Sequence, residues 1–94
     1  MIDIIGVKRL GAYRLELRFS DASVGVHDFA RLAARNGEMV RPVEDPAYFD
    51  RVSIEDGALT WPNGYDVDPV ALHAEMKQAG ELRSADAARV TGRA

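Results

Sequence analysis

The residues that could do chemistry in this chain are few, because it has no cysteine and only two histidines, His27 and His73. A metal site normally needs three or four converging nitrogen, oxygen or sulfur ligands, and the sequence has no H-x-x-x-H or H-x-E spacing. The serines lack the G-x-S-x-G context of a hydrolase nucleophile, and no glycine-rich phosphate loop is present. We therefore expect no metal, no cofactor and no catalytic residues.

The densest polar stretch runs from Trp61 to Pro69. Asp66 and Asp68 lie two residues apart, so on an extended segment both carboxylates would point to one side, as an acid–base pair or a cation site requires. A structural interpretation is favoured, because Asp68 precedes a proline as a helix cap and Asp66 follows Asn63-Gly64 as a turn residue. The alternative is a small ligand-binding protein or enzyme that uses this stretch, with a candidate surface of Trp61, Asn63, Tyr65, Asp66, Asp68 and His73.

Strand parity assigns the aromatic and imidazole side chains to faces. Trp61 alternates with Leu59 and is expected in the core, whereas Tyr65 is the better candidate for a contact residue. His27 falls on the polar side of its strand, and His73 is placed on the outward side of its helix.

The first hairpin is predicted from the alternation of apolar and polar residues over 13–20 and 23–27. A two-residue loop, Asp21-Ala22, would pair Phe19 with Val24 and Leu17 with Val26, all on the apolar face. Ala22 is unusual in such a loop, since a type I′ turn favours glycine.

The second hairpin is predicted from Asp56-Gly57, a dipeptide typical of type I′ turns, between residues 51–55 and 58–61. It sets Ile54 against Leu59 and Val52 against Trp61.

The other elements complete an α+β fold: an antiparallel β-meander and a second β-hairpin with two or three short helices. The first strand, residues 2–10, has a mixed pattern that indicates either a bulge or two covered faces. Helices are expected over 29–35 after Asp28, over 46–49 after Asp45, and over 69–79 ending at Gly80, while 39–44 is expected to be extended. We predict a single domain over 1–80 and a tail over 81–94 that is a frayed segment or a solvated helix.

Composition limits the function further. The chain has 94 residues, 47% of them hydrophobic and 29% charged, with a formal net charge of −3. It has no apolar run long enough for a membrane span, and the acidic balance lacks the excess that drives nucleic-acid binding. Lys8, Arg9, Arg14 and Arg18 could gather on the solvent side of the first hairpin, although Glu16 interrupts them. We expect a cytoplasmic protein that binds neither membranes nor nucleic acid.

The chain resembles the short bacterial proteins of the domain of unknown function 2442 family. The resemblance rests on a set of segments that together cover roughly residues 2–75: Val7-Lys8 with Leu10, residues 13–21, residues 24–28, Pro42-Val43, residues 45–49, and the most specific one, residues 59–69 with Leu72. Ala22 departs from the family pattern, which commonly has glycine there.

The resemblance implies a small α+β fold similar to the N-terminal domain of a longer relative that carries a helix-turn-helix. It also implies an antitoxin-like partner of a small toxin-like protein of the domain of unknown function 4160 family, and it supplies no catalytic residues. We expect no DNA-binding half here, since few residues follow Gly80. The expected function is a non-enzymatic protein-interaction module that binds a protein partner or itself, as a homodimer.

Overall fold

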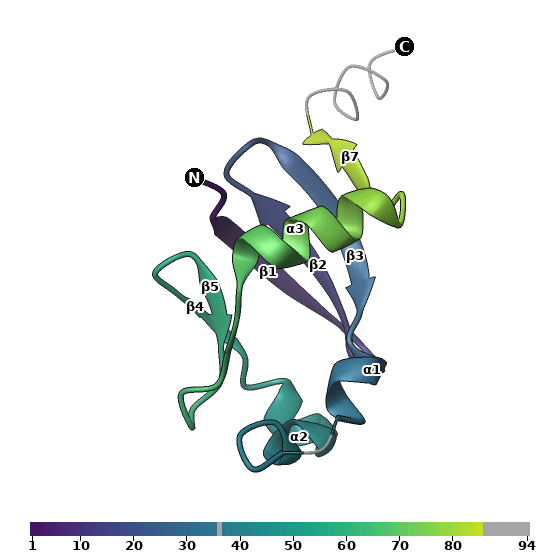
Figure 1. Ribbon diagram of the computed structural model, residues 1–94. Helices are drawn as coiled ribbons and strands as arrows, with labels where there is room; N and C mark the ends of the chain where they lie inside the picture. The colour runs from purple at the N-terminus through teal and green to yellow at the C-terminus, as the bar shows by residue number, and fades with distance from the viewer. Residues whose placement is uncertain (36, 86–94) are drawn as a thin grey trace.

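The computed structural model describes residues 1–35 and 37–85 and has the predicted α+β fold (Figure 1). Sheet A has the order β1-β2-β3-β7, and sheet B has the order β4-β5-β6. The strands are β1 (Ile4–Gly11), β2 (Arg14–Phe19), β3 (Ser23–Asp28), β4 (Ser53–Glu55), β5 (Ala58–Thr60), β6 (Asp66–Val67) and β7 (Leu82–Ser84). The helices are α1 (Ala30–Ala33), α2 (Pro46–Phe49), α3 (Pro69–Gln78) and the 3₁₀ helix η1 (Arg41–Glu44).

Helix α3 crosses one face of sheet A (Figure 1), which we call the inner face, and the opposite side is the outer face. The alternation predicted for β2 is confirmed, because Leu15, Leu17 and Phe19 are all 0% exposed on the inner face. Leu72 and Met76 of α3 belong to the same core. The core continues through Phe29, Val43, Phe49, Val52, Leu59 and Trp61, so that one apolar interior joins both sheets.

The register predicted for the first hairpin is wrong by one residue. The loop has three residues, Ser20 to Ala22: the Ala22 amide donates to the Phe19 carbonyl oxygen at 3.1 Å, and Ala22 has φ +71°. A turn that ends in a left-handed residue is the usual form of a three-residue hairpin loop. Val24 therefore pairs with Arg18, and Val26 with Glu16, which moves both valines from the inner to the outer face.

The second hairpin has the predicted register, with Ile54 opposite Leu59. Asp56 and Gly57 have φ +51° and +78°, as a type I′ turn requires. The Gly57 carbonyl oxygen accepts a hydrogen bond of 2.8 Å from the Ile4 amide, so the turn also ties sheet B to β1.

Strand β1 completes the predicted meander and contains the bulge that was one of two interpretations of its pattern. Its register against β2 shifts between Ile4 and Gly6 and again between Arg9 and Gly11. Arg9 consequently lies opposite Leu15 on the inner side, where its guanidinium donates to the carbonyl oxygens of Asp50 and Val52.

Two of the three predicted helix caps, Asp45 and Asp68, are confirmed. The carboxylates of Asp45 and Asp68 each accept a hydrogen bond of 3.0 Å from the first turn of α2 and α3. Helix α1 is shorter than predicted, and its N-cap is Phe29 rather than the predicted Asp28, whose carboxylate accepts from the Ala30 amide. The extended conformation expected around residues 41–44 is wrong, because the φ of Pro42 also suits the first turn of a helix and η1 forms there.

The chain continues past the predicted domain end at residue 80 into β7, which pairs with Ser23 to Gly25 of β3. A Cβ atom at Gly25 would lie 2.1 Å from the Glu81 carbonyl oxygen, so this close crossing requires glycine. The rest of the predicted tail, residues 86–94, lies outside the described residues. None of the helices in the described part of the chain is long and apolar enough to cross a membrane.

Candidate functional site

The segment that begins at Trp61 is held by hydrogen bonds within the fold. Trp61 is 1% exposed, as predicted, and its indole donates to the Phe49 carbonyl oxygen at 3.1 Å. Asn63 is the turn residue here: its amide donates to the Tyr48 hydroxyl, its side-chain nitrogen donates to the Met39 carbonyl oxygen, and its Oδ1 accepts from the Tyr65 amide. These polar groups position the loop between β5 and β6.

Tyr65 is half-buried, with its ring centroid 5.8 Å from that of Trp61. It borders a shallow surface hollow whose other lining residues are Arg35, Gly37, Glu38, Met39 and Val40. Met39 is 49% exposed. Of the predicted surface residues, Tyr65 borders this hollow, whereas the exposed residues Asn63, Asp66 and Asp68 do not line it.

The two carboxylates that could have formed an acid–base pair have separate places. Asp66 is exposed on β6 opposite Thr60, whereas Asp68 caps α3 through the Val70 amide. The turn role predicted for Asp66 belongs to Asn63, while the cap role of Asp68 is confirmed.

His73 turns toward sheet A, so its predicted outward position is wrong. Its side chain is 16% exposed, its ring packs edge-on against Phe19 at 5.0 Å, and its Nε2 lies 2.9 Å from an Asp21 carboxylate oxygen. The hydroxyl of Ser23 also donates to Asp21 at 2.6 Å. That hydrogen bond, helped by the Ser23 amide and by His73, lowers the pKa of Asp21 from its ordinary value of 3.8.

His27 is also on the inner face, because the one-residue change of register places it opposite Leu15. Its Nδ1 lies 2.7 Å from Glu81 and its Nε2 lies 3.1 Å from Glu75, so the two carboxylates meet opposite sides of the ring. Across the described residues, no three or more His, Cys, Asp and Glu side chains are grouped so as to hold a metal ion. Both histidines connect the α3 region to sheet A.

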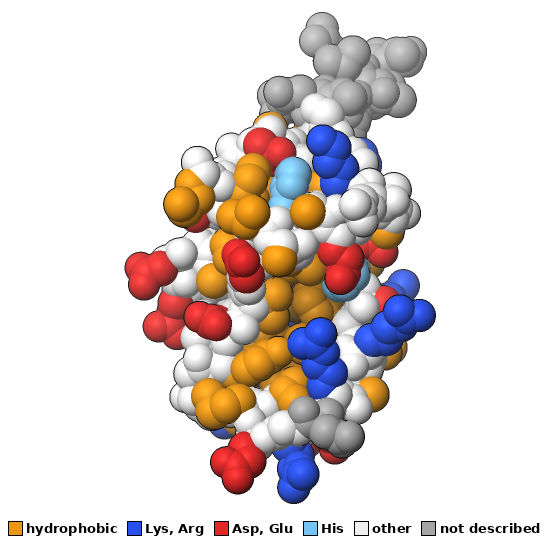
Figure 2. All heavy atoms as spheres, viewed as in Figure 1, with side chains coloured by type: hydrophobic (Ala, Val, Ile, Leu, Met, Phe, Trp, Pro, Cys, Tyr) orange, Lys and Arg blue, Asp and Glu red, His pale blue; other side chains and the backbone are white. Residues whose placement is uncertain are grey.

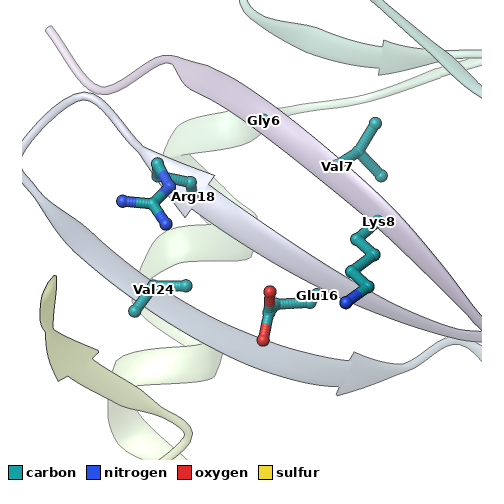
Figure 3. Close-up of a pocket in the computed structure, with 6 residues that line it drawn as sticks. All are labelled: Gly6, Val7, Lys8, Glu16, Arg18 and Val24. Atoms are coloured by element: carbon teal, nitrogen blue, oxygen red, sulfur yellow. The ribbon is translucent and has the colours of Figure 1, made fainter. Parts of the chain in front are cut away.

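The outer face of sheet A carries a surface of which the sequence suggested only basic residues. A hollow on it, drawn in Figure 3, is lined by Gly6, Val7, Lys8, Glu16, Arg18 and Val24. Val24 is 4% exposed although it lies outside the continuous core, and Val26 beside it on β3 is half-buried. The predicted register had assigned both valines to the core.

The outer face is basic. Lys8, Arg14 and Arg18 are exposed on it, and the register adds Arg83 of β7 opposite Val24. Of the four basic residues suggested by the sequence, only Arg9 lies on the other face. Glu16 and Asp28 also belong to the outer face, which thus holds four of the ten basic and two of the fourteen acidic residues in residues 1–35 and 37–85. Six basic and twelve acidic residues lie elsewhere in the described part of the chain.

Comparison with known proteins identifies the family but not a characterised relative. The family model described as protein of unknown function (DUF2442) matches residues 4–78, which include β1 to β6 and the helices α1, η1, α2 and α3. No curated protein matches the chain, and no solved structure matches it. The chain therefore belongs to the DUF2442 family of proteins of unknown function.

Proposed function

We propose that the protein is a non-enzymatic interaction module that binds a protein partner through the outer face of sheet A. The observation that carries this proposal is the contrast between the net charge of the chain, −3, and the basic outer face, with a hollow floored by Gly6 and Val24. Apolar contact area surrounded by charged side chains is the usual anatomy of a protein–protein contact.

The face supports the proposal better than the sheet edges do. Strand β1 is an edge of sheet A, but its Ile4 amide already donates to Gly57 of sheet B, and Arg9 reaches across to two carbonyl oxygens. The opposite edge, β7, has only three residues. Addition of a partner strand needs a longer free row of backbone groups.

The alternative of a ligand site or enzyme in the stretch from Trp61 to Pro69 receives less support. The Trp61 indole, the Asn63 side chain and the Asp68 carboxylate all form hydrogen bonds within the fold. His73 contacts Asp21 in the loop between β2 and β3. Groups already engaged in holding a loop are poorly placed to converge on a substrate.

The more specific form of the proposal is an antitoxin-like role. The family resemblance implies a small partner of the domain of unknown function 4160 family, and a homodimer is the alternative assembly. Co-expression with such a protein followed by size-exclusion chromatography with light scattering tests it. We expect one peak with the mass of a heterocomplex, whereas separate elution of the two chains would contradict this form.

A further inference from the structure

We propose that the outer face of sheet A binds an acidic polypeptide segment of the partner, with carboxylates on the basic side chains and a small apolar residue over the hollow. This inference rests on the proposed function and adds the chemistry of the partner. The basic side chains come from the adjacent strands β1 and β2 and from β7, so the backbone ladder fixes their spacing.

The cations of this face are available to an external anion. Among the described residues, Lys8, Arg14 and Arg18 form no ion pair, and the Arg83 guanidinium is 3.8 Å from Glu16, at the outer limit of such a contact. Arginine presents a planar fork that matches a carboxylate with two hydrogen bonds. A carboxylate that binds here therefore need not displace a close internal partner.

The centre of the face selects against a uniform polyanion. Glu16 lies between Lys8 of β1 and Val26 of β3, so a carboxylate placed directly over it would be repelled. The hollow bordered by Gly6, Arg18 and Val24 (Figure 3) has room for a small side chain. A segment that alternates acidic and small apolar residues fits both features.

Nucleic acid is the less favoured polyanion. All the aromatic residues of the protein belong to the core or pack against it, so the outer face has no ring on which a base could stack. Figure 2 shows acidic side chains gathered on the side of the molecule where the β4–β5 hairpin lies.

The test uses a labelled peptide of alternating Glu and Val residues with blocked ends, and its binding to the full chain is followed by fluorescence anisotropy. In the variant R14Q/R18Q we expect binding about tenfold weaker, since two face cations are lost. The matched control R31Q/R41Q loses two exposed cations from α1 and η1 and should bind like the unchanged protein. Melting temperatures of both variants should match the unchanged protein.

A second variant tests the hollow without a change of charge. Gly6→Ala adds a methyl group 3.4 Å from the Arg18 Cβ, an ordinary contact distance, so the fold should tolerate it while the hollow is partly filled. We expect several-fold weaker binding of the Glu-Val peptide. Undiminished binding by both Gly6→Ala and R14Q/R18Q would overturn the inference.

Three further outcomes relate this inference to the proposed function. Tighter binding of a single-stranded oligothymidine than of the peptide would overturn the acidic-segment inference in favour of a nucleic-acid surface. If R14Q/R18Q still forms the heterocomplex with the co-expressed protein but neither the unchanged protein nor any variant binds the peptide, the chain is an interaction module, and both the outer-face location and the acidic-segment inference are wrong. If neither complex forms, both proposals fail.

Discussion

The two faces of sheet A are built from the same strands but have different consequences for the protein. The inner face packs Leu15, Leu17 and Phe19 against α3 and the rest of the core, and all three are fully buried. The outer face alternates with it residue by residue and exposes Arg14 and Arg18. Because stability depends on one face and the proposed recognition on the other, neighbouring residues of β2 should respond to substitution in opposite ways.

The largest expected effect is on the inner face. Leu17→Ala removes a fully buried side chain and leaves a cavity, which should lower the free energy of unfolding by about 2–5 kcal/mol. Arg18→Ala, one residue along the same strand, should change it by about 0.5 kcal/mol or less, because the side chain is exposed. Urea titration followed by circular dichroism measures both, and equal losses would remove the distinction between the faces.

A glycine on each face gives the second comparison. Gly25→Ala places a Cβ 2.1 Å from the Glu81 carbonyl oxygen, so the crossing between α3 and β7 must move, at a cost of about 1–3 kcal/mol. Gly6→Ala on the outer face meets only Arg18 Cβ at 3.4 Å and should be close to neutral. Thermal unfolding and the amide exchange rates of Leu82 to Ser84 distinguish them; unchanged β7 protection in Gly25→Ala would contradict this packing.

The loop that sets the register of the outer face gives a smaller effect with the opposite sign. Ala22 has φ +71°, a conformation that costs an L-residue about 1 kcal/mol and costs glycine almost nothing. Ala22→Gly should therefore raise the free energy of unfolding by up to about 1 kcal/mol. Gly57→Ala, with φ +78° and a Cβ 2.4 Å from an Asp3 carboxylate oxygen, is the reverse change and should be destabilising.

The smallest effect is the pH dependence from Asp21. The pKa of this carboxyl is lowered in the folded protein, chiefly by the Ser23 hydroxyl. At pH values above 3.8, its ordinary pKa, the ionised carboxylate therefore stabilises the fold. That contribution is lost as the pH falls through the lower folded pKa. Asp21→Asn should thus be less stable than the unchanged protein at neutral pH, and the difference should shrink in acid. A difference independent of pH would contradict this assignment.

The sequence predicted the inner face better than the outer one, and the two hairpins show why. Asp56-Gly57 has a turn chemistry that allows one loop length, so the pairing of Ile54 with Leu59 followed from it. Ser20-Asp21-Ala22 has no such signal, and a loop one residue longer moved Val24, Val26 and His27 to the opposite faces. The outer-face position of Val24 and Val26 was missed for that reason.

Tertiary contacts account for most other differences between sequence and structure. Strand β7 has one large apolar residue, Leu82, and its conformation comes from pairing with β3 rather than from its own pattern. Helical spacing alone predicts an outward His73, because it does not show that this side chain contacts Asp21 in the loop between β2 and β3. The residue types of the stretch from Trp61 to Pro69 suggested a contact surface, whereas their hydrogen bonds hold a loop.

The most direct test of the recognition surface is a nuclear magnetic resonance titration of the isotopically labelled protein with the Glu-Val peptide. The outer-face account predicts shift changes that concentrate at Lys8, Glu16, Arg18, Val24 and Val26, with the amides of the inner-face core nearly unmoved. Changes concentrated instead at Met39 and Tyr65 would place the contact in the other hollow and contradict the central claim.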